Sequence, residues 1–119
     1  MIQKSVPAWF EIPAADFERA VGFYEKLLDT KLIREEMGPM SLAVFPHERP
    51  HPSGAVIRKE GHAPSQDGSV VYLNVADIRP VLARASTVLV PLTKLPDEAG
   101  VFAQIRDSEG NRVGLYSAH

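Results

Sequence analysis

An internal repeat is the feature of this 119-residue chain that most restricts its fold. A strand-like stretch at 8–12 is followed by Asp16, a favoured helix N-cap, and by apolar residues at helical spacing. The same pattern returns from residue 70, with Asp77 as the second N-cap. Further strands are expected at 31–34, 40–45 and 54–59 in the first half, and at 87–90, 101–106 and 112–116 in the second. The order strand–helix–strand–strand–strand therefore occurs twice, which predicts two similar modules.

The two halves also align residue by residue. Ala15-Asp16-Phe17 falls on Ala76-Asp77-Ile78, and Ile12 falls on Leu73. The segment EGHAPSQDG between the halves is rich in glycine, proline and polar residues, as linkers are. We therefore expect one α+β domain over 1–119, with module one at about 6–60, a linker at about 61–68 and module two at about 69–118. Each module would have a sheet with a helix on one face, which leaves the other face for another role.

Composition excludes several classes of protein. The net charge of −2 provides no basic field for nucleic acid or an anionic membrane. The absence of cysteine rules out disulfides, thiolate nucleophiles and cysteine-ligated metals. No apolar stretch is long enough to cross a bilayer, and the first residues do not resemble a secretory signal. A cytoplasmic protein is expected.

A literal H-E-x-x-H stands at His47-Glu48-Arg49-Pro50-His51. In zinc hydrolases this motif works because a helix places both histidines on one face. Pro50 lies inside the motif, and proline removes an amide donor and disfavours helix in the residue before it. The motif is therefore interpreted as a solvated loop, and the four histidines of the chain are not expected to bind metal.

The segments WFEIPAADFERAVGFYEKLL, YLNVADI and DSEGNRVGLYS together resemble the vicinal oxygen chelate superfamily, which includes glyoxalase I, bleomycin-resistance proteins and extradiol dioxygenases. The resemblance covers nearly the whole chain. It implies two tandem βαβββ modules that form a curved, partly closed mixed sheet around a central cavity, with helices outside, often within a dimer. It does not imply one activity, because such folds carry several.

The superfamily's enzymes typically hold a divalent metal with one residue from the first and one from the last strand of each module. The resemblance places those positions at Trp9, Val56, Val70 and Gly114. None of these side chains suits a divalent cation, and Glu11 alone cannot replace four ligands. We expect no metal and no cofactor.

Strand alternation predicts which residues line the cavity. The expected ligand-binding residues combine aromatic rings with a few polar groups, as small-molecule sites do: Trp9, Glu11, Arg58, Tyr72, Asn74, Phe102, Gln104 and Tyr116. An arginine there, Arg58 or Arg106, could hold a carboxylate or phosphate. Arg112, beside the last turn, is expected to be solvated. The same rings could equally plug the cavity, with Glu11 in a structural ion pair.

Three functions follow from this pattern. The first is a metal-independent protein, of the bleomycin-resistance type, that binds a small planar or charged compound as a homodimer. The second is an enzyme, either metal-dependent through unrecognised ligands or with Glu11 as general base near Tyr72. The third is an interaction module whose own side chains fill the cavity. The first is preferred because the four ligand positions are lost while the aromatic lining is retained.

Overall fold

The computed structural model describes residues 7–119. Module one contains β1 (Trp9–Pro13), α1 (Phe17–Leu28), β2 (Ile33–Met37), β3 (Met40–Val44) and β4 (Ser53–Arg58). Module two contains β5 (Tyr72–Asn74), α2 (Ile78–Ala83), β6 (Thr87–Lys94), the 3-10 turn η1 (Pro96–Glu98), β7 (Val101–Arg106) and β8 (Arg112–Ser117). The predicted α+β class and the repeated βαβββ order are confirmed.

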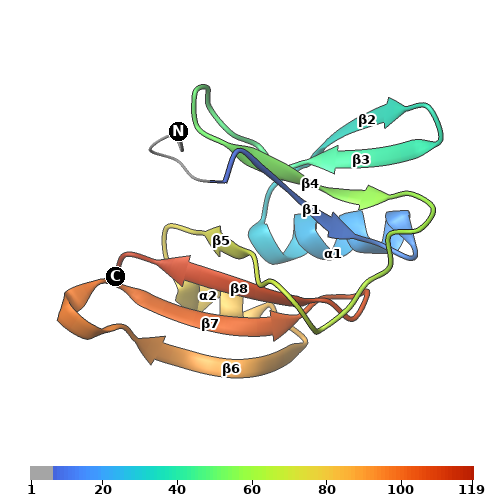
Figure 1. The fold of residues 1–119 in the computed structure, drawn as a ribbon. Helices are drawn as coiled ribbons and strands as arrows, with labels where there is room; N and C mark the ends of the chain where they lie inside the picture. Colours follow the sequence, from blue (N-terminus) through green and yellow to red (C-terminus); the bar gives the residue numbers. More distant parts are fainter. Residues whose placement is uncertain (1–6) are drawn as a thin grey trace.

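Each module forms its own four-stranded mixed sheet, and the two sheets have the same topology. The strand orders are β1-β4-β3-β2 and β5-β8-β7-β6. The first strand of each module pairs in parallel with the last, and the other pairs are antiparallel. A parallel pair needs a crossover connection, which α1 and α2 begin. Within residues 7–119, the strands thus form two separate sheets, one in each module, with no hydrogen-bonded strand pair between them (Figure 1).

Both helices begin at the predicted aspartates. A side-chain oxygen of Asp16 accepts from the Arg19 amide at 3.1 Å, and Asp77 accepts from the Arg79 amide at 3.1 Å. These bonds satisfy amides that the helix itself leaves without a partner. In α1 the predicted apolar stripe is buried at Ala20, Val21, Tyr24 and Leu27. No helix within residues 7–119 has both the length and the hydropathy needed to cross a membrane.

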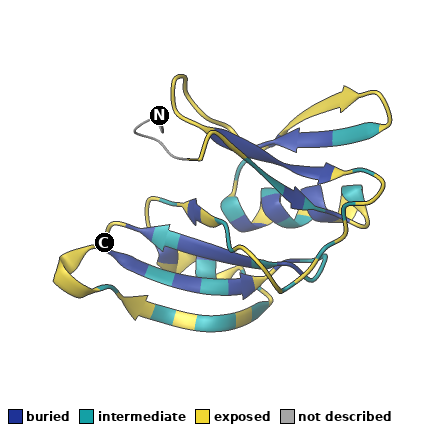
Figure 2. Cartoon of the chain, in the orientation of Figure 1, coloured by how far each residue is buried: buried dark blue, intermediate teal, exposed yellow. Residues whose placement is uncertain are grey.

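One hydrophobic core joins the two modules. It contains the stripes of both helices together with residues from the helix-facing side of each sheet, such as Ile12, Val56 and Leu115. Figure 1 shows α1 between the two sheets and α2 behind β7 and β8. The helix-facing sides of both sheets therefore point into this core, and their opposite sides, which we call the outer faces, point away from it. Figure 2 shows burial concentrated in the inner strands, with β2 exposed along its length.

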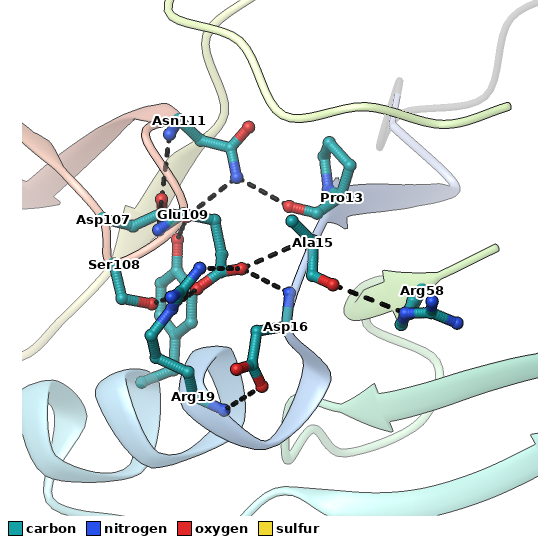
Figure 3. Close-up of polar contacts among 10 residues, drawn as sticks. Pro13, Ala15, Asp16, Arg19, Arg58, Asp107, Ser108, Glu109 and Asn111 are labelled. Carbon is teal, nitrogen blue, oxygen red and sulfur yellow. Dashed lines mark hydrogen bonds and ion pairs between the residues drawn. The ribbon is translucent and has the colours of Figure 1, made fainter. Parts of the chain in front are cut away.

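The β7–β8 turn fastens module two to the start of α1 (Figure 3). Asp107 is 5% exposed, and its carboxylate accepts from the Tyr24 hydroxyl at 2.6 Å and from the Asn111 side-chain amide at 2.9 Å. Asn111 also donates to the Pro13 carbonyl at 2.7 Å. The turn that the sequence places between two strands is therefore an intermodule contact as well as a hairpin.

Glu109, in the same turn, caps α1 from outside the helix. Its side chain is 1% exposed, and its carboxylate accepts from the backbone amides of Ala15 at 3.0 Å and Asp16 at 2.7 Å. The Arg19 guanidinium donates two further bonds, at 2.7 and 3.1 Å. A negative charge at a helix N-terminus is favourable because the unpaired amides and the helix dipole both attract it.

The pKa shifts of Glu109 in this turn and of Tyr24 in α1 lead us to expect that the fold is less stable at both low and high pH. Burial alone would raise the pKa of Glu109, but hydrogen bonds from Arg19, the Asp16 amide and Ser108 lower it below its usual value. Glu109 therefore stabilises the fold above about pH 4.5, and this stabilisation is lost as the pH falls through its lowered pKa. Burial, followed by the charge of Asp107, raises the pKa of Tyr24 well above 10.

The contribution of Tyr24 has the opposite sign. A raised pKa means that its stabilisation is complete below about pH 10 and is lost as the pH rises toward the folded-state value. We expect urea unfolding to show a decline in unfolding free energy above pH 10 for the native chain. Tyr24→Phe should be less stable at neutral pH but should have a flatter alkaline profile. Equal alkaline slopes in the two proteins would contradict this assignment.

Candidate functional site

The outer face of the second sheet carries a tyrosine laid flat over a glycine. Tyr72 on β5 pairs with Gly114 on β8, and a Cβ at position 114 would overlap the Tyr72 ring. The ring can cross β8 only because residue 114 has no side chain. Tyr72 is 44% exposed, so its ring forms part of an accessible surface. One of the four ligand positions is thus covered by an aromatic ring.

A chain of hydrogen bonds extends from the tyrosine across the same face. The Gln104 Nε2 donates to the Tyr72 hydroxyl oxygen at 2.6 Å. The Arg112 Nη1 donates to Gln104 Oε1 at 2.8 Å, and Arg112 Nε donates to the Gln66 carbonyl in the linker at 3.2 Å. The expectation that Arg112 is solvated is therefore wrong. The linker carbonyl and the glutamine hold the guanidinium along the sheet, a tertiary contact that residue spacing cannot reveal.

Two further aromatic residues complete this face. Phe102 meets the Tyr72 ring edge to face, with centroids 6.1 Å apart. Tyr116 is the neighbour of Phe102 on β8, and its hydroxyl donates to the Ala99 carbonyl at 2.7 Å. Asn74 pairs with Tyr116 and is exposed. The predicted residues of module two, Tyr72, Asn74, Phe102, Gln104 and Tyr116, thus come from three adjacent strands, and the structure brings Tyr72, Phe102 and Gln104 into contact.

The predicted residues of module one do not meet on one face. Trp9 is 44% exposed, and Glu11 lies 3.4 Å from the Lys59 ammonium, so the partner of Glu11 is a lysine. Glu11, Asp67 and Arg112 all line a cavity of about 160 Å³ where β1 and β8 meet under the linker. Glu11 is therefore placed at the junction of the modules.

Two placements in β4 were wrong. Val56 pairs with Ile12 and is buried in the shared core, whereas Ala55 pairs with Glu11 and takes the outer face. Arg58, at the end of the same strand, bonds the Ala15 carbonyl beside α1 through its Nε at 3.4 Å. The reason is that β4 carries apolar residues on both faces. The sequence therefore does not show which of its residues point toward the helix and which point away from it.

The outer face of the first sheet is largely apolar. Leu42, Val44, Ala55 and Ile57 form a second small cluster there, with Met40 packed against it. Ile33 pairs with Val44 and Met37 with Met40, so both β2 residues extend this face, and they are 57% and 56% exposed. Glu35 lies between these two residues, opposite Leu42, so the face is largely but not wholly apolar. A largely apolar sheet face with exposed large side chains is typical of an interaction surface.

A groove of about 1170 Å³ separates the start of module one from β5 and α2. Val70, Tyr72 and Asn74 line one side of it, and Phe10 and Phe45 are among the residues on the other. Its volume is slightly above the range of about 300–1,000 Å³ that is usual for sites of small organic molecules. Val70, Tyr72 and Asn74, which the sequence analysis placed toward the cavity, thus line this groove.

The H-E-x-x-H stretch also borders this groove but is not helical. Residues 45–48 carry no regular secondary structure, and His47 shares a hydrogen bond with the Phe45 carbonyl at 3.3 Å. His47 and His51 both line the groove. Within residues 7–119, no three His, Cys, Asp or Glu side chains are arranged to hold a metal. The interpretation as a loop is confirmed.

The residues at the superfamily's metal positions do not fit a divalent cation. Trp9, Val70 and Gly114 offer no oxygen or imidazole donor. With the strand register corrected, the fourth position is Ala55, which has none either. The Tyr72 ring moreover lies on Gly114, where the last-strand ligand would project. This donor set supports no reaction that passes through a metal at these positions.

Comparisons with known proteins agree with this architecture. A sequence profile of the Glyoxalase/Bleomycin resistance protein/Dioxygenase superfamily matches residues 7–115. The chain belongs to this superfamily. A search of curated protein sequences found no significant match.

Solved structures of the superfamily share the fold at low sequence identity. Glyoxalase I from Zea mays superposes with a TM-score of 0.67 at 18% identity, over 93% of this chain and 45% of the maize chain. Lactoylglutathione lyase from Agrobacterium tumefaciens gives 0.65 at 16%, over 95% and 93%. A glyoxylase/bleomycin resistance protein/dioxygenase domain from Frankia sp. EAN1pec gives 0.63 at 18%, over 92% and 88%. The chain thus spans about half the length of the maize enzyme.

Proposed function

We propose that this superfamily member is a cytoplasmic, metal-independent protein that binds a small planar or charged compound. The observation that carries the proposal is the Tyr72 ring lying over Gly114, with Phe102 and Gln104 in contact with it. A metal-dependent relative would present a ligand at this place. Here the chain presents an aromatic surface and directed hydrogen bonds instead, which suit stacking and polar recognition.

We further propose that a second copy of the chain covers the outer faces. The outer face of the first sheet is largely apolar, with Ile33 and Met37 more than half exposed. The maize glyoxalase I chain is about twice the length matched by this chain, so the fold occurs there within a larger unit. A partner copy would bury the apolar face and could enclose a ligand against Tyr72.

A melting-temperature screen tests the binding function. A compound that binds only the folded state raises the free energy of unfolding by about 2.7 kcal/mol at one hundred times its dissociation constant. For a domain of this size that is a rise of roughly 10 °C. We expect planar aromatic compounds to give such shifts and Gly114→Ala to abolish them, because the added methyl displaces the Tyr72 ring. A broad panel without any shift would refute the proposal.

Sedimentation equilibrium tests the partner copy. We expect the native chain to sediment as a dimer, and Met37→Glu to sediment as a monomer because a charge cannot be buried against an apolar face. Glu36→Gln is a suitable control, since Glu36 lies on the same exposed strand but pairs with Ser41 on the opposite face of the sheet, and the change removes a charge. A native chain that is monomeric at high micromolar concentration would contradict the dimer.

A further inference from the structure

The hydrogen-bond chain on the outer face of the second sheet has a direction that its chemistry dictates. Arg112 can only donate, so the Gln104 atom facing it at 2.8 Å must be the carbonyl oxygen. The other end of the Gln104 amide is then the NH₂ group, which faces the Tyr72 hydroxyl at 2.6 Å. The Tyr72 oxygen must therefore accept, and its own proton is left without a partner within this chain of bonds.

We propose that this free proton selects the ligand: Tyr72 donates its hydroxyl proton to a carboxylate or carbonyl oxygen of a planar aromatic compound bound on this face. The inference rests on the binding function proposed above and specifies its ligand class. The Phe102 edge and the exposed Tyr72 ring provide the apolar surface for the flat part of that compound.

The charge of Arg112 favours an acceptor over a donor at this place. A chain of hydrogen bonds that begins at a cation polarises each successive group, so the Tyr72 proton becomes a stronger donor. Glu11 and Asp67 line the small cavity beside Arg112, and Glu11 is paired with Lys59. Because Arg112 donates to Gln104 and Gln104 donates to Tyr72, the polarisation passes from the guanidinium through Gln104 to the Tyr72 hydroxyl.

Tyr116 supplies a matched comparison on the same face. Its hydroxyl proton is already donated to the Ala99 carbonyl at 2.7 Å. The two tyrosines on this face thus differ in their protons: Tyr116 donates to Ala99, whereas within residues 7–119 the Tyr72 proton has no acceptor. Removal of the Tyr72 hydroxyl should therefore weaken ligand binding more than removal of the Tyr116 hydroxyl does.

Benzoate and benzamidine are suitable probes because both carry a flat ring and they differ in hydrogen-bonding role. Benzoate only accepts, and benzamidinium only donates. We expect the native chain to prefer benzoate at least tenfold in a calorimetric titration, with ¹⁵N spectra showing a shift of the Gln104 side-chain amide. Tyr72→Phe should reduce benzoate affinity about tenfold, which corresponds to the loss of one bond to a charged group. Tyr116→Phe should reduce that affinity much less than Tyr72→Phe does, because the Tyr116 proton is already donated to the Ala99 carbonyl.

Gln104→Glu gives the strongest test because it should reverse the preference. A carboxylate at 104 accepts from Arg112 and also from Tyr72, so the Tyr72 oxygen becomes the free acceptor and benzamidine should bind more tightly than benzoate. If this variant does not fold, Gln104→Leu serves instead, because it leaves the Tyr72 hydroxyl free to turn and should bring the two affinities within about twofold.

The outcomes distinguish the ligand class from the binding function. Equal affinity of the native chain for both probes, or an unchanged benzoate affinity in Tyr72→Phe, would overturn the assignment of ligand class while the binding function stands. A failure of benzoate to bind when other planar compounds raise the melting temperature has the same meaning. If no compound of any kind binds, both proposals fail.

Discussion

Asp107→Ala is expected to lower the free energy of unfolding by about 4 kcal/mol, which is near the upper end of what a single substitution costs. The carboxylate is buried and accepts from four donors, namely the Tyr24 hydroxyl, the Asn111 side-chain amide and the backbone amides of Glu109 and Asn111. Its removal leaves the Tyr24 hydroxyl, on a fully buried side chain, without a partner. Urea denaturation followed by circular dichroism measures the change.

Asp107→Asn and Glu60→Ala are the controls for this prediction. Asparagine keeps the shape and one acceptor oxygen, so its loss should be intermediate. Glu60 is exposed in the linker region, and its removal should change the unfolding free energy by less than about 0.5 kcal/mol. If Asp107→Ala were as stable as Glu60→Ala, the contacts of the β7–β8 turn would not stabilise the packing of the two modules.

Glu109→Ala should cost about 3 kcal/mol, because it removes the external cap of α1 and leaves two backbone amides without an acceptor. It also leaves Arg19 without its carboxylate partner. The melting temperature should fall by roughly 12 °C for a domain of this length. Differential scanning calorimetry measures both the melting temperature and the enthalpy.

Glu18→Gln is the matched control on the same helix. Glu18 forms an ion pair with Arg34 at 2.7 Å, but both side chains are largely exposed, so the pair is expected to add little. The two glutamates thus make similar contacts with arginine and differ in burial. Equal melting temperatures for Glu109→Ala and the native chain would show that the cap contributes nothing beyond an exposed pair.

The motif D-x-x-G-N-x-x-G-L, on which the resemblance partly rests, gains a physical explanation from these contacts. Asp107 and Asn111 bridge the turn to α1 and β1, and Gly114 leaves room for Tyr72. Most of the motif therefore stabilises the contact between modules. This explains why it indicates the fold of the superfamily without indicating an activity.

Local signals in the sequence were sufficient for the order of elements, both N-caps and the helical stripe of α1. Each of these depends on residues close together in the chain, such as Asp16 with the Arg19 amide, so short-range physics determines them. The non-helical state of the H-E-x-x-H stretch was also predictable, because proline acts locally.

Contacts between distant residues decided the rest. The phase of β4 depends on its partner strand, since its residues are apolar on both faces, and this moved Val56 and Arg58 away from the predicted lining. Arg112 is held by Gln66 and Gln104, and Glu109 by the start of α1, more than 90 residues away in sequence. Amino-acid pattern determines which segments become helix or strand, but which side chains meet depends on how two sheets and two helices pack, and that is settled only when the whole core forms.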